Sequence, residues 1–401
     1  MHIHPLPRLT RQMAQSLLRP RVWPDPMKPD HTHLYFRGSN AIWHALKILR
    51  LQAGDEVLFP AYHCGIELDV LSAAGLRVSF YKVGRDLTLN TQALLQHIGP
   101  RTRALYVIHY YGVPHDLTEI VELCRKQGLA LIEDCAMALY SRRGTRPVGL
   151  DGDVALFSMW KTVAMPFGGA LMVNNPELQG LRAGQTPSRY EVLRALKQLV
   201  EIEFKGSNLF EAIRRYCVEP FARAIRGASA STSEDSRRKQ PLWLPLFAAE
   251  RCTWGITGLS RHLFLTADPD AIRAARWSNY HRLLDVLRTL SSVTSLYGEL
   301  PEGVCPLYCP VVVDDATAFR QFLLRRGVEA FRMWREVHPL FPQDEFAEEA
   351  YLRSHVVALP IHQHLDTNMQ TMLTEALKVW DRNRPQNAAE ISRCASAEQY
   401  V

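Results

Sequence analysis

Short apolar runs alternate with amphipathic segments from about residue 36 onward. Apolar side chains recur at helical spacing in four segments, at 40–51, 67–75, 91–97 and 116–127. Apolar strands are expected beside them, at 56–62, 77–83, 104–111 and 129–134. Because short apolar strands separated by helices are typical of parallel sheets, this pattern predicts an α/β fold with a large, mainly parallel sheet. Two further strands, at 153–159 and 169–175, lie too close together for a helical crossover, so one strand is expected to be antiparallel.

The pattern changes after residue 176. Helical periodicity with many Arg and Lys residues runs over 187–226, and a Ser-rich loop follows at 227–240. A second, smaller α/β alternation then predicts strands at 307–313, 328–333 and 356–361 and helices at 268–288, 315–326 and 366–381. The expected organisation is a proline-rich N-terminal arm (1–35) on the surface or on a partner, a large domain (36–255) with an insertion at about 187–250, a small C-terminal α/β domain (256–385) and a polar tail (386–401).

Composition restricts the class of protein but does not identify it. The 401 residues are 47% hydrophobic and 22% charged, which is typical of a globular chain and excludes a wholly disordered one. A net charge of +6 is too small for the clustered basic surface of a nucleic-acid-binding protein. The sequence has no apolar run long enough to span a membrane and no signal peptide, so a cytoplasmic location is expected. Cys305 and Cys309 form a single C-x3-C pair with no second half, so no metal site is expected.

Polar residues follow several of the predicted strands. His109 and Tyr110 end one strand, Asp134 ends the next, and Ser158 and Lys161 follow a third. Ligands of open α/β sheets bind outside the carboxyl ends of the strands. Each residue also has an ordinary alternative, since Asp134 alone fits a helix cap and Lys161 alone fits a surface lysine.

A phosphate site is also expected, where Gly38, Ser39 and Asn40 begin the first predicted helix with free N–H groups. Ser39 and Asn40 alone would suggest no more than a helix cap, so the order of these residues along the chain carries more information than any one of them.

That order resembles the DegT/StrS group, the nucleotide-sugar aminotransferase family of fold-type I pyridoxal-phosphate enzymes. The segments that carry the resemblance are GSNAIWHAL (38–46), AGDEVLFPAY (53–62), VIHYYGVPHDL (107–117), LIEDCAMAL (131–139), GDVALFSMWK (152–161), FGGALMVNN (167–175) and, more loosely, LPIHQHL (359–365). The resemblance is close over about 36–180 and loose over 255–385. It implies the fold of type I pyridoxal-phosphate enzymes, with a large, mainly parallel sheet of the seven-stranded type and a smaller C-terminal α/β domain.

The resemblance also implies roles for individual residues. Lys161 would form the Schiff base with pyridoxal 5'-phosphate, and Asp134 would pair with the pyridine nitrogen. Ser39, Asn40 and Ser158 would hold the phosphate. The chemistry agrees, because an electron-withdrawing pyridinium needs a fixed anion, and a lysine that reacts near neutral pH needs a desolvated place such as the apolar surroundings of Lys161.

Three departures from the family pattern concern the cofactor ring. Met137 replaces the Gln that usually contacts the ring, and Ser158 and Lys161 lie closer together than in most members. His63 is the expected ring-stacking residue, with Cys64 or Tyr62 as alternatives.

The function expected from the resemblance is a transaminase that moves an amino group from an amino acid, glutamate by family analogy, to a nucleotide-linked keto-sugar in glycan biosynthesis. The alternative is a related protein that binds the cofactor or only retains the fold, without transamination. Substrate-side candidates are His109, Tyr110, Trp334 and His338. Fold-type I sites are completed by a second subunit, so a homodimer is expected, with Arg261 as a residue that one subunit contributes to the other.

Overall fold

The computed structural model describes residues 2–16, 18–178, 185–187, 192–193, 197 and 251–383. Most of the predicted insertion at 187–250 and all of the tail at 386–401 therefore lie outside the described residues. Within the described part, no helix is both long enough and apolar enough to cross a bilayer.

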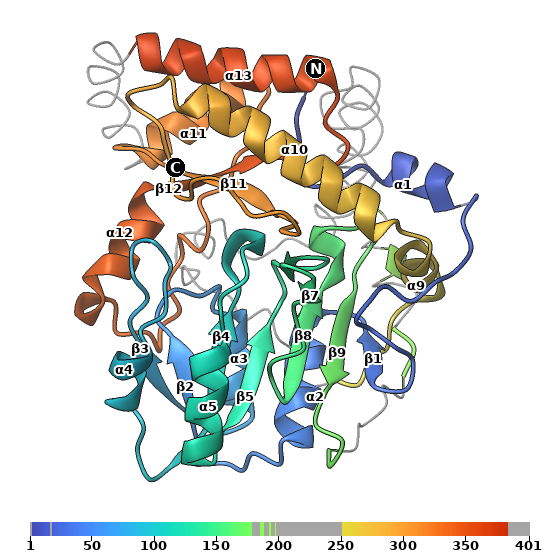
Figure 1. Cartoon of the computed structure of the whole chain (residues 1–401), viewed down its shortest axis with the longest axis vertical. Coiled ribbons are helices and arrows are strands. Elements are labelled where there is room, and N and C mark those ends of the chain that lie inside the picture. The colour runs from blue at the N-terminus through green and yellow to red at the C-terminus, as the bar shows by residue number, and fades with distance from the viewer. Residues whose placement is uncertain are drawn as a thin grey trace, which may run out of the picture.

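A seven-stranded sheet forms the larger part of the described chain (Figure 1). Its strands, in spatial order, are β1 (Thr32–Tyr35), β9 (Gly169–Val173), β8 (Val154–Ser158), β5 (Ala130–Asp134), β4 (Thr102–Ile108), β2 (Glu56–Pro60) and β3 (Arg77–Tyr81). The pairings from β3 to β8 are parallel, whereas β9 runs antiparallel to both of its neighbours. The predicted mainly parallel sheet with an antiparallel strand is confirmed.

Helices cover both faces of this sheet, because its strands are apolar on both sides. Helices α2 (Gly38–Ile48) and α3 (Ile66–Ala73) lie behind the sheet in Figure 1, and α4 (Thr91–Leu95) and α5 (Thr118–Gln127) lie in front. The core between them is fully buried at residues such as Val57, Leu105 and Ile132. A two-stranded hairpin, β6 (Arg142–Arg143) and β7 (Arg146–Pro147), connects β5 to β8.

A smaller three-stranded antiparallel sheet packs with helices above the large sheet (Figure 1). Its strands are β10 (Thr294–Ser295), β11 (Tyr308–Val312) and β12 (Val356–Pro360), and its helices are α10 (Pro269–Leu287), α11 (Ala316–Arg325), α12 (Ala347–His355) and α13 (Thr367–Arg382). Helix α9 (Gly258–Leu265) precedes α10. The predicted α/β character of this part is confirmed, but the expected strand at 328–333 is not found: only single bridges, Ile3 with Val328 and Phe331 with Ala358, occur there.

The N-terminal segment is more regular than predicted. It contains α1 (Leu9–Ser16), and β1 within it pairs with β9 of the large sheet. Its first residues lie on this chain's own small sheet region, where the Ile3 N–H donates to the Gly327 carbonyl at 2.7 Å and the Glu329 N–H donates to the Ile3 carbonyl at 3.0 Å. The sequence pattern missed β1 because THLY is short and only partly buried.

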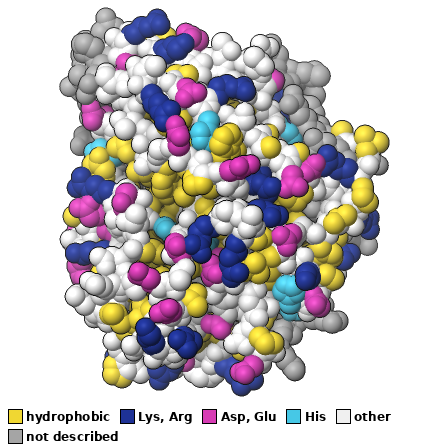
Figure 2. Space-filling model, in the orientation of Figure 1, with side chains coloured by type: hydrophobic (Ala, Val, Ile, Leu, Met, Phe, Trp, Pro, Cys, Tyr) yellow, Lys and Arg dark blue, Asp and Glu magenta, His cyan; other side chains and the backbone are white. Residues whose placement is uncertain are grey.

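Charged side chains are mixed on the face shown in Figure 2. Lys and Arg residues are interspersed with Asp and Glu, and no single-sign region dominates this view. That distribution agrees with the small net charge of +6.

Candidate active site

A cavity of about 380 Å³ lies where the large sheet meets the small one. Its floor consists of residues that follow the carboxyl ends of β2, β5 and β8, together with the start of α2. Its upper wall comes from the segments 307–308 and 331–334 and from Leu6 of the N-terminal segment. This location matches the rule that open α/β sheets bind ligands at the carboxyl ends of their strands.

Lys161 and Asp134 both line this cavity. Lys161 lies on the short 3-10 turn η2 (Met159–Lys161), directly after β8, and no described residue forms a hydrogen bond or ion pair with its ammonium group. Asp134 ends β5 and is almost fully buried. Its carboxylate accepts a hydrogen bond from the Tyr106 hydroxyl at 2.6 Å and one from the Ala136 N–H at 2.7 Å.

Burial and the two hydrogen-bond donors have opposite effects on the pKa of Asp134. Burial raises the pKa of Asp134, while the Tyr106 and Ala136 hydrogen bonds and the charge of Lys161 oppose that rise. Charge-assisted hydrogen bonds of this kind hold a buried carboxylate in one orientation. Asp134 is therefore a fixed acid at the base of the cavity.

The start of α2 forms one corner of the cavity beside the end of β8, with Gly38, Ser39 and Ser158 among its lining residues. Gly169, the first residue of β9, supports this corner from below, because a Cβ placed there would lie 2.6 Å from the Gly38 nitrogen. The close approach of two backbone segments thus explains Gly169, whereas a Cβ on Gly168 would meet the side chains of Met165 and Met159.

Asn40 does not line the cavity. Its side-chain oxygen accepts the Arg37 N–H at 3.1 Å, and its NH₂ group donates to the carbonyls of Arg251 and Cys252 at 2.6 and 3.0 Å. These contacts cap α2 and hold the chain at 251–252 against it, so Asn40 does not occupy the phosphate-binding position expected of it.

The segment after β2 also differs from expectation. His63, the expected ring-stacking residue, is buried among Phe59, Phe80 and Phe341 rather than in the cavity wall, and burial keeps its pKa well below the usual value. Cys64, the stated alternative, lines the cavity. A register difference of one residue explains the change, because neighbouring side chains of an extended segment point to opposite sides.

Met137 is also absent from the cavity wall, and it packs in the core of the large sheet. Ala136, one residue earlier, takes the place in the lining.

Glu67 is the cavity residue that the sequence reasoning missed. It lies in the first turn of α3 and lines the cavity together with Cys64 and Ile66. Its Oε2 is buried and has no hydrogen-bond partner among the described residues. The signal in the sequence was an acidic residue within an otherwise apolar run, IELDVL, after a strand end.

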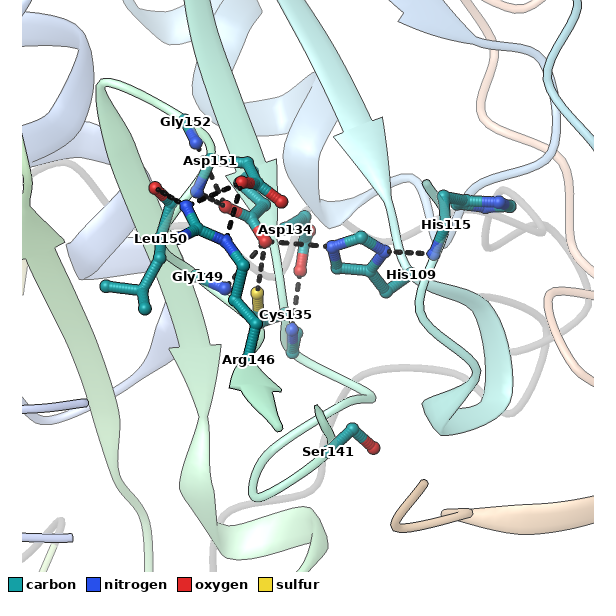
Figure 3. Close-up of polar contacts among 12 residues, drawn as sticks. His109, His115, Asp134, Cys135, Ser141, Arg146, Gly149, Leu150, Asp151 and Gly152 are labelled. Carbon is teal, nitrogen blue, oxygen red and sulfur yellow. Dashed lines mark hydrogen bonds and ion pairs between the residues drawn. The ribbon is translucent and has the colours of Figure 1, made fainter. Parts of the chain in front are cut away.

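The carboxylate of Glu133 lies on the other face of β5 from Asp134, since side chains alternate along a strand. It accepts hydrogen bonds from His109 Nε2 at 3.0 Å and from the N–H groups of Gly149, Asp151 and Gly152 at 2.6, 3.0 and 3.0 Å (Figure 3). Because His109 Nδ1 accepts the His115 N–H at 3.0 Å, His109 is a neutral ring with its proton on Nε2. The cluster holds the strand end and the 149–152 loop together.

This cluster also brings Cys135 near His109 and Glu133, the one set of three potential metal ligands within the described residues. The Glu133 oxygens are already occupied by N–H donors, and burial raises the pKa of the Cys135 thiol well above its usual value. Hydrogen bonding therefore accounts for the cluster without an ion. Cys305 and Cys309 are free, buried thiols.

Of the substrate-side candidates, the structure brings only Trp334 to the cavity. His109 belongs to the Glu133 cluster, and the buried Tyr110 hydroxyl donates to the Tyr62 carbonyl at 2.7 Å. His338 contacts Asp69 at 3.1 Å outside the cavity lining. Arg261 is exposed on α9.

The residues present fit pyridoxal phosphate, the cofactor that the sequence resemblance implies. At one end, small side chains and a helix N-terminus suit a phosphate: a Cβ on Gly38 would lie 3.7 Å from Ser158 Oγ, so a larger residue there would intrude on this corner. Elsewhere in the cavity, Asp134 suits a protonated ring nitrogen, and Lys161 supplies an unpartnered amine. The volume is within the range of small-molecule sites.

Comparison with known proteins points to the same class. Residues 31–183 match the sequence model of the DegT/DnrJ/EryC1/StrS aminotransferase family. GDP-perosamine synthase of Vibrio cholerae is 28% identical over 199 residues, which are 47% of this chain and 52% of that protein. A dTDP-3-amino-3,4,6-trideoxy-alpha-D-glucose transaminase of Streptomyces venezuelae is 32% identical over 185 residues, covering 45% of this chain and 47% of that protein. The chain thus spans about half the length of the curated relatives it matches.

Similarity to solved structures extends beyond the residues that the family model matches. The aminotransferase TlmJ of Streptoalloteichus hindustanus has a TM-score of 0.66 at 19% identity, and the match covers 98% of this chain and 100% of TlmJ. The fold-type I architecture expected from the sequence is therefore confirmed.

Proposed function

We propose that the chain is a pyridoxal-phosphate-dependent aminotransferase of the DegT/DnrJ/EryC1/StrS family, whose sequence model matches residues 31–183. It transfers an amino group from an amino acid, glutamate by family analogy, to a keto-sugar that is nucleotide-linked, in glycan biosynthesis. The observation that carries the proposal is the meeting of Lys161, Asp134 and the N-terminus of α2 in one cavity.

Each of these residues has a separate task. Pyridoxal phosphate, when bound, supplies a reactive carbonyl and an electron-withdrawing ring. Asp134, oriented by Tyr106, holds a proton on the ring nitrogen. Ser39, Ser158 and the first N–H groups of α2 bind the phosphate. Lys161 Nζ, free of other partners in the described chain, accepts a proton from the reacting carbon and returns it.

The walls support an anionic substrate. Arg37 and Arg332 line the cavity, and Arg332 is held by its Nη1 donating to Thr317 Oγ1 at 2.7 Å. Guanidinium groups suit carboxylates and phosphates, which amino acids and sugar nucleotides carry. Trp334 adds an aromatic surface that fits a sugar or base face. The named relatives act on nucleotide-linked sugars, in agreement with this choice.

The proposal includes the assembly and the location. The protein acts as a homodimer in the cytoplasm, with Arg261 reaching the partner's site, and divides into a large domain to residue 255 and a small one from residue 256. Exposure of Arg261 on α9 supports its part in an interface.

The test is spectroscopic and kinetic. Purified protein with pyridoxal phosphate is expected to show the visible absorbance of the lysine-bound cofactor, and Lys161→Ala to lose it. Adding glutamate should convert the bound cofactor to its amine form, and a keto-sugar nucleotide should reverse that change. A cofactor-bound protein that responds to no amino donor would instead support the non-transaminating alternative.

A further inference from the structure

Two carboxyl groups line the same cavity, and they differ in how their oxygens are partnered. Asp134 is held by Tyr106 and Ala136, whereas Glu67 Oε2 is buried without a partner among the described residues. An unpartnered buried carboxyl oxygen costs stability, so its retention in a ligand cavity points to a contact made when the cavity is filled.

The surroundings of Glu67 decide its protonation state. Four titratable residues interact electrostatically with Glu67. They are Asp134 at the end of β5, Lys161 in the turn after β8, Cys64 in the loop before α3, and Tyr106 on β4. Burial and the charge of Asp134 raise the pKa of Glu67 to about 7, against the opposing effects of the α3 backbone N–H groups and Lys161. Two adjacent buried carboxyl groups rarely ionise together. The group that ionises is the one whose negative charge is stabilised by hydrogen-bond donors, and here that group is Asp134.

We propose that Glu67 is a second carboxyl of the cofactor site, held neutral beside the anionic Asp134, and that it donates a hydrogen bond to the bound cofactor. Asp134 then remains the single anion of the site, and Glu67 contributes a donor that only its protonated form provides. This inference rests on the proposed function, since the ligand is the cofactor named there.

The test measures binding of pyridoxamine phosphate, which needs no covalent bond to Lys161. Tryptophan fluorescence serves as the signal, because Trp160 and Trp334 line the cavity. For the wild-type protein, the affinity for pyridoxamine phosphate should fall as the pH rises through about 7. Glu67→Gln has a neutral donor of the same size, so it should bind as tightly as wild type at low pH, and its affinity should not show this fall. Glu67→Leu should weaken binding about tenfold at low pH. Glu122→Gln, an exposed carboxylate on α5, is the matched control and should bind as wild type does.

A second readout uses the protein without cofactor. A carboxyl whose pKa is raised on folding stabilises the folded state at low pH, and that stabilisation is lost as the pH rises through about 7. Glu67→Gln should therefore be more stable than wild type at about pH 8 and similar to it below about pH 4.5.

The outcomes separate the two proposals. If wild-type protein fails to bind pyridoxamine phosphate, the proposed function and the role of Glu67 both fall. If wild type binds and Glu67→Leu binds equally well at every pH, only the role of Glu67 falls. If Glu67→Leu is weaker but Glu67→Gln retains the full pH dependence of wild type, the proton donation by Glu67 is contradicted.

Discussion

The Tyr106 hydroxyl orients Asp134, the acid at the base of the cavity. It donates to Asp134 Oδ2 at 2.6 Å from the neighbouring strand β4 and thereby lowers the pKa of Asp134 against the rise caused by burial. Tyr106→Phe removes this donor without changing the packing of the ring. We expect kcat/KM to fall about three- to tenfold and its acid limb to move to higher pH, because more Asp134 is protonated there.

The measurement is the pH profile of kcat/KM for glutamate. A profile of Tyr106→Phe that superimposes on the wild-type profile after scaling would contradict the orientation of Asp134 by this hydroxyl. Tyr81→Phe is the matched control, since its hydroxyl donates to a backbone carbonyl rather than to a carboxylate.

At the scale of elements, the contact between β9 and α2 positions the phosphate corner. A methyl group at Gly169 would lie 2.6 Å from the Gly38 nitrogen and closer still to the Arg37 carbonyl, so Gly169→Ala must push the start of α2 outward. We expect it to weaken binding of pyridoxamine phosphate by at least about tenfold and to destabilise the fold by about 1–3 kcal/mol. Titration calorimetry and chemical denaturation measure the two effects.

Gly258→Ala is the control for that substitution. Gly258 begins α9, and a Cβ there would meet no atom within 4 Å. Its affinity should equal that of wild type. Equal affinity of Gly169→Ala would show that the α2 start does not bind the phosphate.

The hydrogen-bonded cluster around Glu133 joins the strands β4 and β5 to the 149–152 loop. Burial alone would raise the pKa of Glu133, but the hydrogen bonds from His109 and from the loop N–H groups outweigh it and lower the pKa to about 2. Ionised Glu133 therefore stabilises the fold above about pH 4.5, and this contribution is lost as the pH falls toward about 2.

Glu133→Gln places an NH₂ group among N–H donors, so we expect a loss of about 2–5 kcal/mol at pH 7 in urea denaturation, and a smaller further loss on acidification than in wild type. Glu375→Gln, which removes only an exposed ion pair with Lys378, should change stability by less than about 0.5 kcal/mol. A Glu133→Gln protein as stable as wild type would contradict the structural role of the cluster.

The element pattern was predictable from sequence where apolar strands are buried on both faces, and it failed where tertiary contacts replace periodicity. The six inner and edge strands β2, β3, β4, β5, β8 and β9 coincide with apolar runs. The segment 328–333 has strand composition but makes only single bridges, because its residues turn toward the cavity and the N-terminal segment. The strand-end rule points to the edge of the sheet at which the cavity lies. The rule does not determine which of two adjacent residues faces the cavity. Cys64 and Ala136 line the cavity, whereas His63 and Met137 pack in the core. His109 forms a hydrogen bond with Glu133.

At the scale of the whole molecule, the N-terminal segment links the small sheet region to the cavity. Ile3 is fully buried beside Val328, the Arg8 N–H donates to His364 Nδ1 at 2.9 Å, and Leu6 between them forms part of the cavity wall. The segment is thus held at both ends by residues more than 300 positions away, and its middle closes the ligand site. This arrangement makes the anchoring of Ile3 a condition for a closed cavity.

Ile3→Ala tests that condition from outside the cavity. Loss of a fully buried Ile side chain should cost about 2–4 kcal/mol of stability. If the N-terminal segment loosens as a unit, Leu6 moves away from the cavity wall and water enters. Pyridoxamine phosphate should then dissociate several times faster, as measured by stopped-flow fluorescence, although Ile3 itself does not line the cavity. Leu18→Ala, at a residue that is 88% exposed, should change neither quantity. An Ile3→Ala protein that is less stable but releases the ligand at the wild-type rate would show that the cavity closes independently of the N-terminal segment.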